Sequence, residues 1–252
     1  MSSIKDLLSG APFAHRGLHD AAAGVPENSL IAMQAAVDRG FGIELDVRLG
    51  AADEVIVFHD VDLERLAGET VGAHERDRRQ VRLLGTGEHI PSLAEVLELV
   101  DGRVPILVEI KGNGPLRGGL EAGVHAALSD YRGPFTVMSF DPTIVAWFAE
   151  NEPGWWRGQL SAGHARDTHL WGENPQSAAG AWHRWPSKPH YLSHYQADMP
   201  YAPLAEARAE GLPVITWTVK SAARAAELAA HVDNIIFENF DPHSPLANAG
   251  GA

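Results

Sequence analysis

The sequence predicts a (β/α)₈ TIM barrel, and three observations favour this fold. The chain has 252 residues, close to the size of one such barrel. Short β-rich runs alternate with helical patterns along the chain, as in parallel α/β proteins. Several of these runs are almost continuously apolar, which is typical of strands buried on both faces of a sheet. About eight such units in this length favour a closed barrel over an open sheet, so we expect a single barrel domain over residues 1–252.

The strand candidates are the short runs rich in β-branched and aromatic residues. Val55–His59 follows Gly42–Arg48 too closely for a helical crossover, so we expect it to extend the second strand or to pair with it in antiparallel fashion. Residues 61–91 come next and are rich in mixed charge, which predicts a small insertion after the second strand. The other candidates, in chain order, are Phe13–Arg16, Ile106–Lys111, Phe135–Phe140, Trp156–Leu160, His190–His194, Val214–Val219 and Asn234–Glu238.

Polar residues in front of helical patterns predict where helices begin. One pattern begins at Leu30, behind the capping candidates Asn28 and Ser29. The stretch 171–189 has no clear period and is compatible with a rim loop as well as with a helix, and the tail 242–252 predicts a frayed end. Further helices are expected to begin at Ser92, at Asp141-Pro142 and at Ser221, the last of them running to His231.

Composition narrows the classes of function. The formal net charge of −13 disfavours nucleic acid as a partner, because binding a phosphate backbone needs a basic surface. The absence of cysteine excludes disulfides and thiolate-bound zinc, so a metal would need oxygen or imidazole ligands. No apolar run approaches the roughly 20 residues that cross a bilayer, and the N-terminus lacks the apolar region of a signal peptide. We therefore expect a cytoplasmic protein without stable membrane anchoring, with no indication of its oligomeric state.

Carboxylates occur at matching places in two predicted strands. Glu44 and Asp46 are two residues apart in the run Gly42–Arg48, and side chains at this spacing point to the same side of a strand. Like charges on a buried face are costly unless a cation compensates them. Glu109 lies near the end of the run Ile106–Lys111, and the carboxyl ends of barrel strands meet at one face. The three carboxylates predict a site for one divalent cation, Mg²⁺ or Ca²⁺, with Mn²⁺ also suitable.

The same residues have a structural interpretation as well. Glu44 and Asp46 would then face outward and pair with helix lysines or arginines, and Glu109 would pair with Lys111 inside the barrel. Such a pair is plausible on one strand, but charged residues two apart in both apolar strands favour a shared site. In that site Lys111, two residues after Glu109, is a cation that points into the pocket.

Two histidines end predicted strands and suggest acid–base chemistry. His15 and His59 are each more often structural when taken alone, but beside carboxylates at neighbouring strand ends they form a general acid–base pair. Arg16 adds a planar fork of donors that suits phosphate oxygens. Glu27 lies in the loop after the first strand, where it either joins the metal or substrate shell or complements the dipole of the following helix.

Five short motifs then connect these residues to a known family. They are His-Arg-Gly at 15–17, Pro-Glu-Asn-Ser at 26–29, Glu-Leu-Asp at 44–46, Phe-His-Asp at 58–60 and Glu-Ile-Lys at 109–111. In this order they resemble the glycerophosphodiester phosphodiesterases, and Val214–Val219 is similar to that family's seventh-strand segment. The resemblance covers most of the chain and is strongest from residue 14 to residue 111.

The resemblance implies both a fold and an activity. It implies a TIM barrel with an insertion after the second strand, and metal-dependent hydrolysis of glycerophosphodiesters to an alcohol and glycerol 3-phosphate. A small anionic phosphodiester would be the substrate. The residues it implies are the metal ligands Glu44, Asp46 and Glu109, the catalytic histidines His15 and His59, and the substrate contacts Arg16, Lys111 and Glu27.

The chain departs from the family pattern at two places. Lys220 follows the Trp-Thr-Val segment, where family members often have Asn, and Ile235–Asn239 replaces a Thr-Asp-x-Pro-like turn. These positions border the leaving group and affect the identity of the substrate rather than the class of reaction. Trp217 is expected near the pocket mouth, where it covers a glycerol or choline-like group, or else in the barrel core.

Three alternative functions are compatible with parts of the sequence. A lysophospholipase D or sphingomyelinase-D-like enzyme would need an exposed apolar rim, whereas we expect the candidate tryptophans to pack loops onto the barrel. A non-catalytic barrel that binds a phosphorylated metabolite would lack a catalytic residue, and none is missing. A metal-dependent sugar isomerase would explain the carboxylates but not His-Arg-Gly. The candidate rim tryptophans are Trp155, Trp156, Trp171, Trp182 and Trp185.

Overall fold

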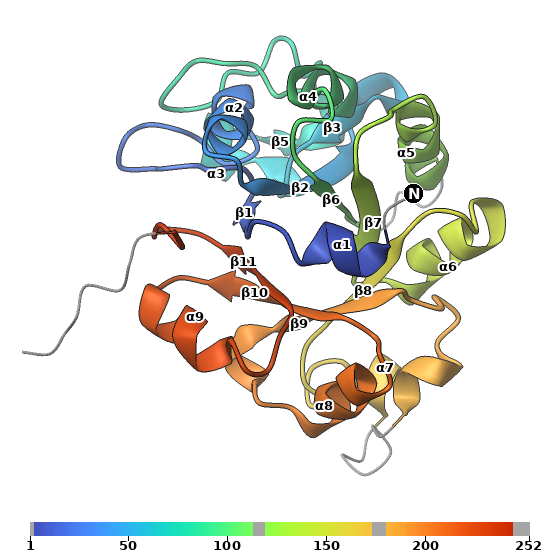
Figure 1. The fold of residues 1–252 in the computed structure, drawn as a ribbon. Coiled ribbons are helices and arrows are strands. Elements are labelled where there is room, and N and C mark those ends of the chain that lie inside the picture. The colour runs from blue at the N-terminus through green and yellow to red at the C-terminus, as the bar shows by residue number, and fades with distance from the viewer. Residues whose placement is uncertain (1–2, 113–118, 173–179, 244–252) are drawn as a thin grey trace, which may run out of the picture.

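Eight parallel strands close into a barrel in the computed structural model, which describes residues 3–112, 119–172 and 180–243 (Figure 1). The strands are β1 (Phe13–His15), β2 (Gly42–Leu49), β6 (Ile106–Ile110), β7 (Phe135–Ser139), β8 (Arg157–Ser161), β9 (Tyr191–Tyr195), β10 (Val214–Val219) and β11 (Asn234–Phe237). β1 pairs with β2 on one side and with β11 on the other, which closes the ring. The predicted fold class is confirmed.

One further strand belongs to the same sheet but runs the other way. β3 (Val55–Val57) pairs antiparallel with β2, as one of the two expected arrangements requires. The chain then enters the 61–91 segment, which contains β4 (Asp62–Leu63), α3 (Glu64–Ala67) and β5 (Glu69–Gly72). This segment has a small apolar core of its own, formed by Ile56, Phe58, Leu63, Ala73, Val81, Leu83 and Ile90.

Helices connect most of the parallel strands and cover the outside of the barrel (Figure 1). Four of them begin at the predicted caps, because Ser29, Ser92, Asp141 and Ser221 each accept a hydrogen bond from a backbone N–H in the first turn. In the described part of the chain the helices are α1 (Ile4–Leu8), α2 (Leu30–Asp38), α4 (Leu93–Val100), α5 (Leu120–Leu128), α6 (Pro142–Asn151), α7 (Thr168–Trp171), α8 (Ala202–Ala209) and α9 (Ala222–Leu228), besides α3.

Two local predictions need correction. Asn28 does not cap α2, because its side chain turns to Asp46 instead. α9 ends at Leu228, before the expected end at His231. The stretch 171–189 is largely irregular where it is described, with a short 3₁₀ helix at Ala181–Arg184, and residues 173–179 lie outside the described residues. So do residues 244–252, on which most of the predicted frayed tail falls.

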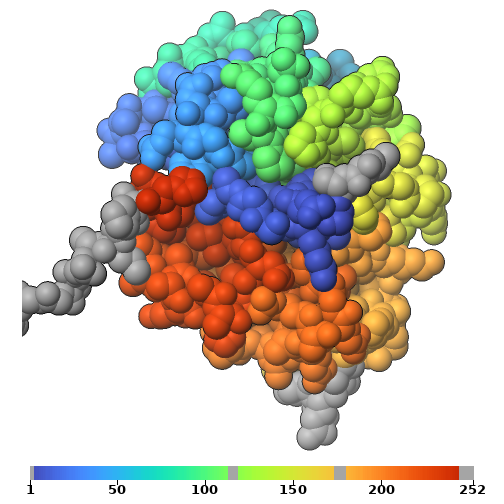
Figure 2. All heavy atoms as spheres, in the orientation of Figure 1, coloured from blue at the N-terminus to red at the C-terminus, as the bar shows by residue number. Residues whose placement is uncertain are grey.

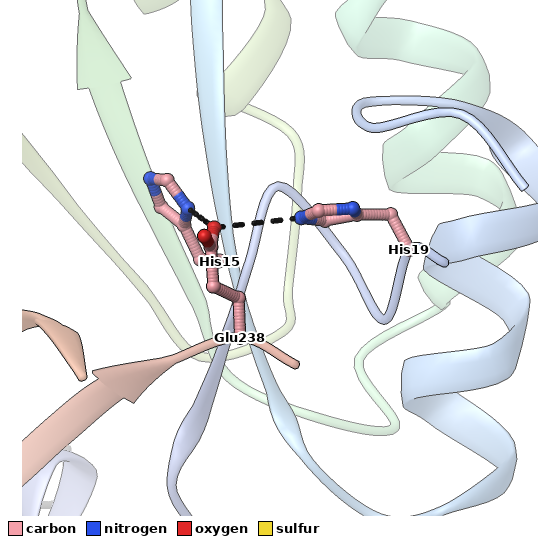
Figure 3. A group of neighbouring side chains, drawn as sticks. All are labelled: His15, His19 and Glu238. Atoms are coloured by element: carbon pink, nitrogen blue, oxygen red, sulfur yellow. Dashed lines mark hydrogen bonds and ion pairs between the residues drawn. The ribbon is translucent and has the colours of Figure 1, made fainter. Parts of the chain in front are cut away.

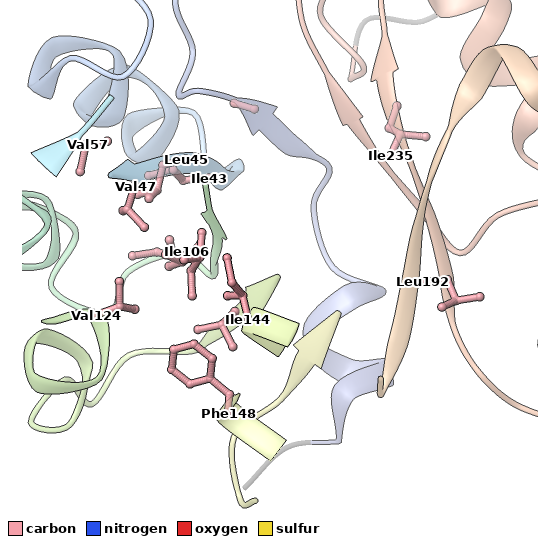
Figure 4. Packing of buried hydrophobic residues seen from close by; sticks show 14 of the residues in the cluster. Ile43, Leu45, Val47, Val57, Ile106, Val124, Ile144, Phe148, Leu192 and Ile235 are labelled. Atoms are coloured by element: carbon pink, nitrogen blue, oxygen red, sulfur yellow. The ribbon is translucent and has the colours of Figure 1, made fainter. Parts of the chain in front are cut away.

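The barrel has one apolar layer outside its wall and a second inside it. Ile43, Leu45 and Val47 alternate along β2 and belong to the outer layer between strands and helices (Figure 4). The inner layer includes Phe13 and Leu107, and α1 closes it at one end by burying its apolar residues against it. Figure 2 shows atoms of this N-terminal segment at the centre of that face of the molecule. The opposite end of the barrel, where the strands finish, is thus the end left for a site.

Most of the candidate rim tryptophans are structural. Trp171, Trp182 and Trp185 are buried in the outer layer, and Trp185 donates its indole N–H to the backbone oxygen of Leu170 at 2.7 Å. Trp155 and Trp156 are half-buried against the apolar layers. The expectation that these side chains pack loops onto the barrel is confirmed. Within the described residues, no helix has both the length and the apolar character needed to span a membrane.

A buried histidine makes the stability of the fold depend on pH. His194 lies in β9, stacks on Tyr201 at 5.1 Å between ring centroids, and has Ser161 Oγ 2.9 Å from its Nδ1. Burial lowers the pKa of His194 to about 4, whereas the unfolded chain should return it to about 6.5. The unfolded state therefore binds more protons between these values, and the free energy of unfolding should decrease as pH falls from 6.5 to 4, by about 3 kcal/mol for this group.

Urea unfolding at several pH values measures this effect. Because the stabilising contribution of the neutral imidazole is complete above pH 6.5, His194→Gln should flatten the pH dependence between 6.5 and 4 relative to the wild type. His183→Gln is the control, since His183 is largely exposed. An equally steep pH dependence in His194→Gln would show that His194 does not carry it.

Candidate active site

The predicted site residues gather at the carboxyl ends of the strands. A cavity of about 190 Å³ lies there, and its polar lining includes His15, Arg16, Glu44 and His59. Its apolar wall comes from the inner layer of the barrel. The complete lining among the described residues is His15, Arg16, Glu44, His59, Glu109, Lys111, Met138, Phe140, Leu160, Trp217, Thr218 and Ile236. A larger cavity of about 810 Å³ between α1 and α8 is lined by none of the predicted site residues.

Three buried carboxylates meet beside this cavity. Glu44, Asp46 and Glu109 each offer an oxygen atom within 4.8 Å of the others. The strand alternation explains why, since the neighbours of these residues along β2 and β6 face the outer apolar layer. Burial raises the pKa of Glu44 well above its ordinary value, and the negative charges of Asp46 and Glu109 raise it further. The inward orientation predicted from the two-residue spacing is what the structure shows.

Two cations partly compensate the carboxylates. Lys111 Nζ lies 2.9 Å from Asp46 Oδ1 and also contacts Glu109 Oε1, while Arg16 Nε lies 3.2 Å from Asp46 Oδ2. Burial alone would raise the pKa of Asp46, but Lys111 and Arg16 hold it below its ordinary value. Asn28, held at a positive φ of 55°, donates a hydrogen bond from Nδ2 to Asp46 Oδ2 at 2.9 Å. The Glu109–Lys111 ion pair of the structural interpretation is therefore present, within the shared site.

The cluster is suited to a divalent cation. Lys111 and Arg16 form ion pairs with Asp46 and Glu109, whereas among the described residues the buried Glu44 carboxylate has no ion pair with a lysine or an arginine. The only protein hydrogen bond recorded for the Glu44 carboxylate in the described residues is the one from the backbone N–H of Arg16, at 3.0 Å. Closely spaced oxygen donors with excess negative charge are the ligands that hard divalent cations prefer. The residues present thus fit such an ion.

His15 is oriented by a carboxylate from the other end of the chain. Glu238, directly after β11, lies with Oε2 2.7 Å from His15 Nδ1. Because a carboxylate only accepts, Nδ1 carries the proton and Nε2 is left unprotonated, 3.9 Å from Glu44 Oε2. Figure 3 shows the ring of His19 approaching the same carboxylate, with Nε2 3.6 Å from Oε2. Burial lowers the pKa of His15, although Glu238 acts in the opposite direction.

The group formed by His15, His19 and Glu238 could also be considered as a metal site. Lys220 Nζ lies 2.5 Å from Glu238 Oε1, however, and already supplies a positive charge there. The ion pair joins the two positions at which the chain departs from the family pattern. Lys220 and Glu238 thus form one unit that supports His15.

His59 has an analogous carboxylate partner. Asp60 Oδ1 lies 2.7 Å from His59 Nδ1, so Nδ1 again carries the proton and Nε2 remains free. Arg48 fixes the backbone at this point by donating from Nε to the carbonyl oxygen of His59 at 2.6 Å. Burial lowers the pKa of His59, while the charge of Asp46 raises it. Both histidines therefore line the cavity with one uncommitted ring nitrogen each.

Glu27 lies behind Arg16. Arg16 Nη1 donates to Glu27 Oε1 at 2.6 Å, and Arg65 from α3 donates to both oxygens of the same carboxylate. Glu27 does not cap α2, whose cap is Ser29. Among the described residues Glu27 contacts Arg16 but does not line the cavity, and both roles considered for it stay predictions.

Trp217 combines the two environments expected for it. The indole lines the cavity, packs edge-on against Phe140 at 5.3 Å between ring centroids, and lies at a tilt against Tyr195 at 5.0 Å. Its Nε1 donates to the backbone oxygen of Ser193 at 3.2 Å. The ring is thus held in place at the cavity wall.

Sequence patterns did not identify the groups that support the site residues. Asn28, Asp60, Arg65, Lys220 and Glu238 all contact a predicted site residue or its partner. Asp60 and Asn28 were visible as parts of the Phe-His-Asp and Pro-Glu-Asn-Ser motifs. Glu238 ends a predicted strand, which was a usable signal, but nothing local distinguishes Arg65 from its neighbours.

Comparisons with known proteins agree with this geometry. A model of the glycerophosphoryl diester phosphodiesterase family matches residues 15–241. A curated glycerophosphodiester phosphodiesterase of Caldanaerobacter subterraneus subsp. tengcongensis is 32% identical over 129 residues, which is 47% of this chain and 52% of that protein. The chain spans 52% of the length of this relative and 61% of the length of a second curated relative.

Solved structures resemble the whole barrel. A glycerophosphodiester phosphodiesterase of Thermotoga maritima has a TM-score of 0.70 at 25% identity and covers 90% of this chain and 94% of its own. A phosphodiesterase of Oleispira antarctica, in complex with the product sn-glycerol-3-phosphate, has a TM-score of 0.75 at 20% identity over 91% of this chain and 92% of its own, which shows the shared fold. The match of the family model over most of the chain shows that this protein belongs to the glycerophosphoryl diester phosphodiesterase family.

Proposed function

We propose that the protein hydrolyses glycerophosphodiesters to an alcohol and glycerol 3-phosphate, with a divalent cation as cofactor. The observation that carries this proposal is the presence, in one small cavity, of two histidines with free Nε2 atoms beside a carboxylate cluster and two cations. The Oleispira antarctica relative, whose structure holds sn-glycerol-3-phosphate, supports the same class of ligand.

The binding groups would neutralise and orient the phosphate. Arg16 and Lys111 line the cavity and present N–H donors to phosphate oxygens. Glu44, Asp46 and Glu109 would hold a Mg²⁺ or Ca²⁺ ion, or Mn²⁺, and the bound ion would offset charge on a non-bridging oxygen. Trp217 would contact the alcohol or glycerol part of the substrate.

The two histidines would move the protons of the reaction. One accepts the proton of the attacking hydroxyl group while its oxygen forms a bond to phosphorus, and the other donates a proton to the leaving alcohol as its P–O bond breaks. Glu238 and Asp60 keep the protonated Nδ1 atoms turned away from the cavity. The attacking group is either water or the neighbouring glycerol hydroxyl. Only the second route forms a cyclic phosphate first. Water must then attack its phosphorus and break one ring P–O bond to give glycerol 3-phosphate, so ³¹P NMR of the reaction distinguishes the two routes.

Hydrolysis of a panel of substrates tests the proposal. With Mg²⁺ or Ca²⁺, the protein should release glycerol 3-phosphate and the free alcohol from glycerophosphocholine, glycerophosphoethanolamine or glycerophosphoglycerol, and excess chelator should abolish the release. Lysophosphatidylcholine in the same assay tests a lipid phosphodiesterase. Binding of glycerol 3-phosphate without turnover of any substrate would indicate a non-catalytic barrel, and full activity in excess chelator would contradict the role of the cation.

A further inference from the structure

Arg65 makes an unusual set of contacts for a side chain outside the cavity. It lies in α3, within the 61–91 segment, and donates from Nη1 and Nη2 to the two oxygens of Glu27 at 2.9 and 2.7 Å. Its Nε donates to Asp60 Oδ2 at 2.7 Å. One guanidinium group therefore binds two carboxylates from two different loops of the barrel.

Each of these carboxylates holds a residue that lines the cavity. Glu27 Oε1, which accepts from Arg65, also accepts a hydrogen bond from Nη1 of Arg16 at 2.6 Å. The other oxygen of Asp60 lies 2.7 Å from Nδ1 of His59. Arg65 is thus the central member of a continuous chain of charged contacts from the phosphate-binding arginine to one of the two histidines.

The three central members of this chain do not touch the cavity. Among the described residues, its lining includes Arg16 and His59 but not Glu27, Arg65 or Asp60. Any effect of Arg65 on a ligand therefore passes through the two residues at the ends of the chain.

Only a guanidinium group can make this set of bonds. The fork of N–H donors on one side of Arg65 matches both oxygens of Glu27, and Nε on the other side remains for Asp60. A lysine ammonium group at this position would retain the charge, but as a compact point charge it could not hold the two carboxylates in this fixed arrangement. The contacts thus depend on shape as well as on charge.

The 61–91 segment holds Arg65 in position through its own small core. Leu63, two residues earlier, is fully buried with Phe58, which directly precedes His59. On the other side, the backbone N–H of Leu84 donates to the carbonyl oxygen of Leu66 at 2.9 Å. Packing of the segment therefore sets the location of Arg65 relative to β3 and to the loop that carries Asp60.

We propose that Arg65 is a positioning residue through which the 61–91 segment sets the orientation of both Arg16 and His59. This inference rests on the proposed function, because it assigns Arg16 to phosphate binding and His59 to proton transfer. The segment is then part of the active site without contributing a side chain to the cavity. Arg65 couples substrate binding to proton transfer, because this one side chain holds in place both Arg16, which binds phosphate, and His59, which transfers a proton.

Kinetics of Arg65→Gln test the proposal against a matched control. Arg76 belongs to the same segment, and its side chain is 43% exposed against 48% for Arg65. Among the described residues it forms an ion pair only with Glu69, with Nε 2.9 Å from Oε2. We expect Arg65→Gln to lower kcat/KM by about 10- to 100-fold, through both a lower kcat and a higher KM. Arg76→Gln should leave both constants unchanged, and thermal unfolding should find both variants folded.

Further variants separate positioning from a purely structural role. Asp60→Asn should reproduce mainly the loss in kcat and Glu27→Gln mainly the rise in KM. Combining either with Arg65→Gln should add little to the shared loss, because the residues act in one chain. Arg65→Lys should fail to restore activity although it keeps the charge. Wild-type constants in Arg65→Gln, or full additivity in the double variants, would overturn the proposal.

A binding measurement keeps this test independent of the proposed function. Calorimetric titration with sn-glycerol 3-phosphate requires no turnover, and we expect Arg65→Gln to weaken its affinity about 10-fold through Arg16 while Arg76→Gln does not. If the wild type hydrolyses no diester but the affinities differ in this way, the proposed reaction fails and the positioning role stands. If the wild type is active and both affinity and kinetics are unchanged in Arg65→Gln, the positioning role fails alone.

Discussion

His59→Ala is expected to lower kcat by about 100-fold or more, because the substitution removes one partner of the proposed acid–base pair. KM should change much less, since phosphate binding is assigned to Arg16 and Lys111. The pH profile of kcat/KM should be bell-shaped in the wild type and should lose one limb in the variant. Steady-state kinetics on the preferred glycerophosphodiester, measured over a range of pH, provide all three observations.

His125 offers a matched control for this experiment. It is 34% exposed against 32% for His59, and Glu152 lies 2.6 Å from its Nε2, but it belongs to α5 on the outside of the barrel. His125→Ala also removes ring contacts with Trp147 and Trp155, so it tests whether lost stability alone reduces turnover. A kcat for His59→Ala within a few-fold of that of His125→Ala would refute proton transfer by His59.

Glu44→Gln should abolish the response of the protein to divalent cations. At a concentration about 100 times Kd, a ligand stabilises the folded state by about 2.7 kcal/mol, which corresponds to about 5–10 °C in Tm for a chain of this size. We expect the wild type to show such an increase with Mg²⁺, Ca²⁺ or Mn²⁺ and the variant to show none. Because glutamine removes a charge that Asp46 and Glu109 repel, the metal-free variant should be at least as stable as the metal-free wild type.

Differential scanning calorimetry with and without the ion measures both effects, and hydrolysis assays should find the variant inactive. Glu69→Gln is the control, because Glu69 pairs with Arg76 away from the cavity. A metal-free Glu44→Gln that unfolds well below the wild type would indicate that Glu44 acts in a structural ion pair. An unchanged rise in Tm on adding metal would place the cation elsewhere.

The fold was predictable because its signals are local. Apolar strands with a two-residue alternation define β2 and β6, and side chains that cap the first turn mark where α2, α4, α6 and α9 begin. α1 was not predicted, because a five-residue helix has little periodicity and is stabilised by the inner layer of the barrel that it covers. Asn28 and Ser29 both have the chemistry of a cap, and only the tertiary hydrogen bond from Asn28 to Asp46 decides between them.

The site was predictable where strand geometry alone determines direction. Glu44, Asp46 and Glu109 point inward because their neighbours face the outer layer, and the structure brings them together with His15, His59, Arg16 and Lys111. Their supporting partners depend on tertiary contacts between distant segments. Glu238 is 223 residues from His15, and Arg65 is 38 residues from Glu27, so no local pattern relates them.

The contact between His15 and Glu238 has a consequence for protein synthesis. β1 leaves the ribosome well before β11, yet the two strands pair, and His15 takes its proton position from a carboxylate just beyond β11. A nascent chain that stops before β11 leaves two open sheet edges and a histidine without its partner. The oriented His15–Glu238 pair can therefore form only once translation has passed residue 238, and truncated products would lack it.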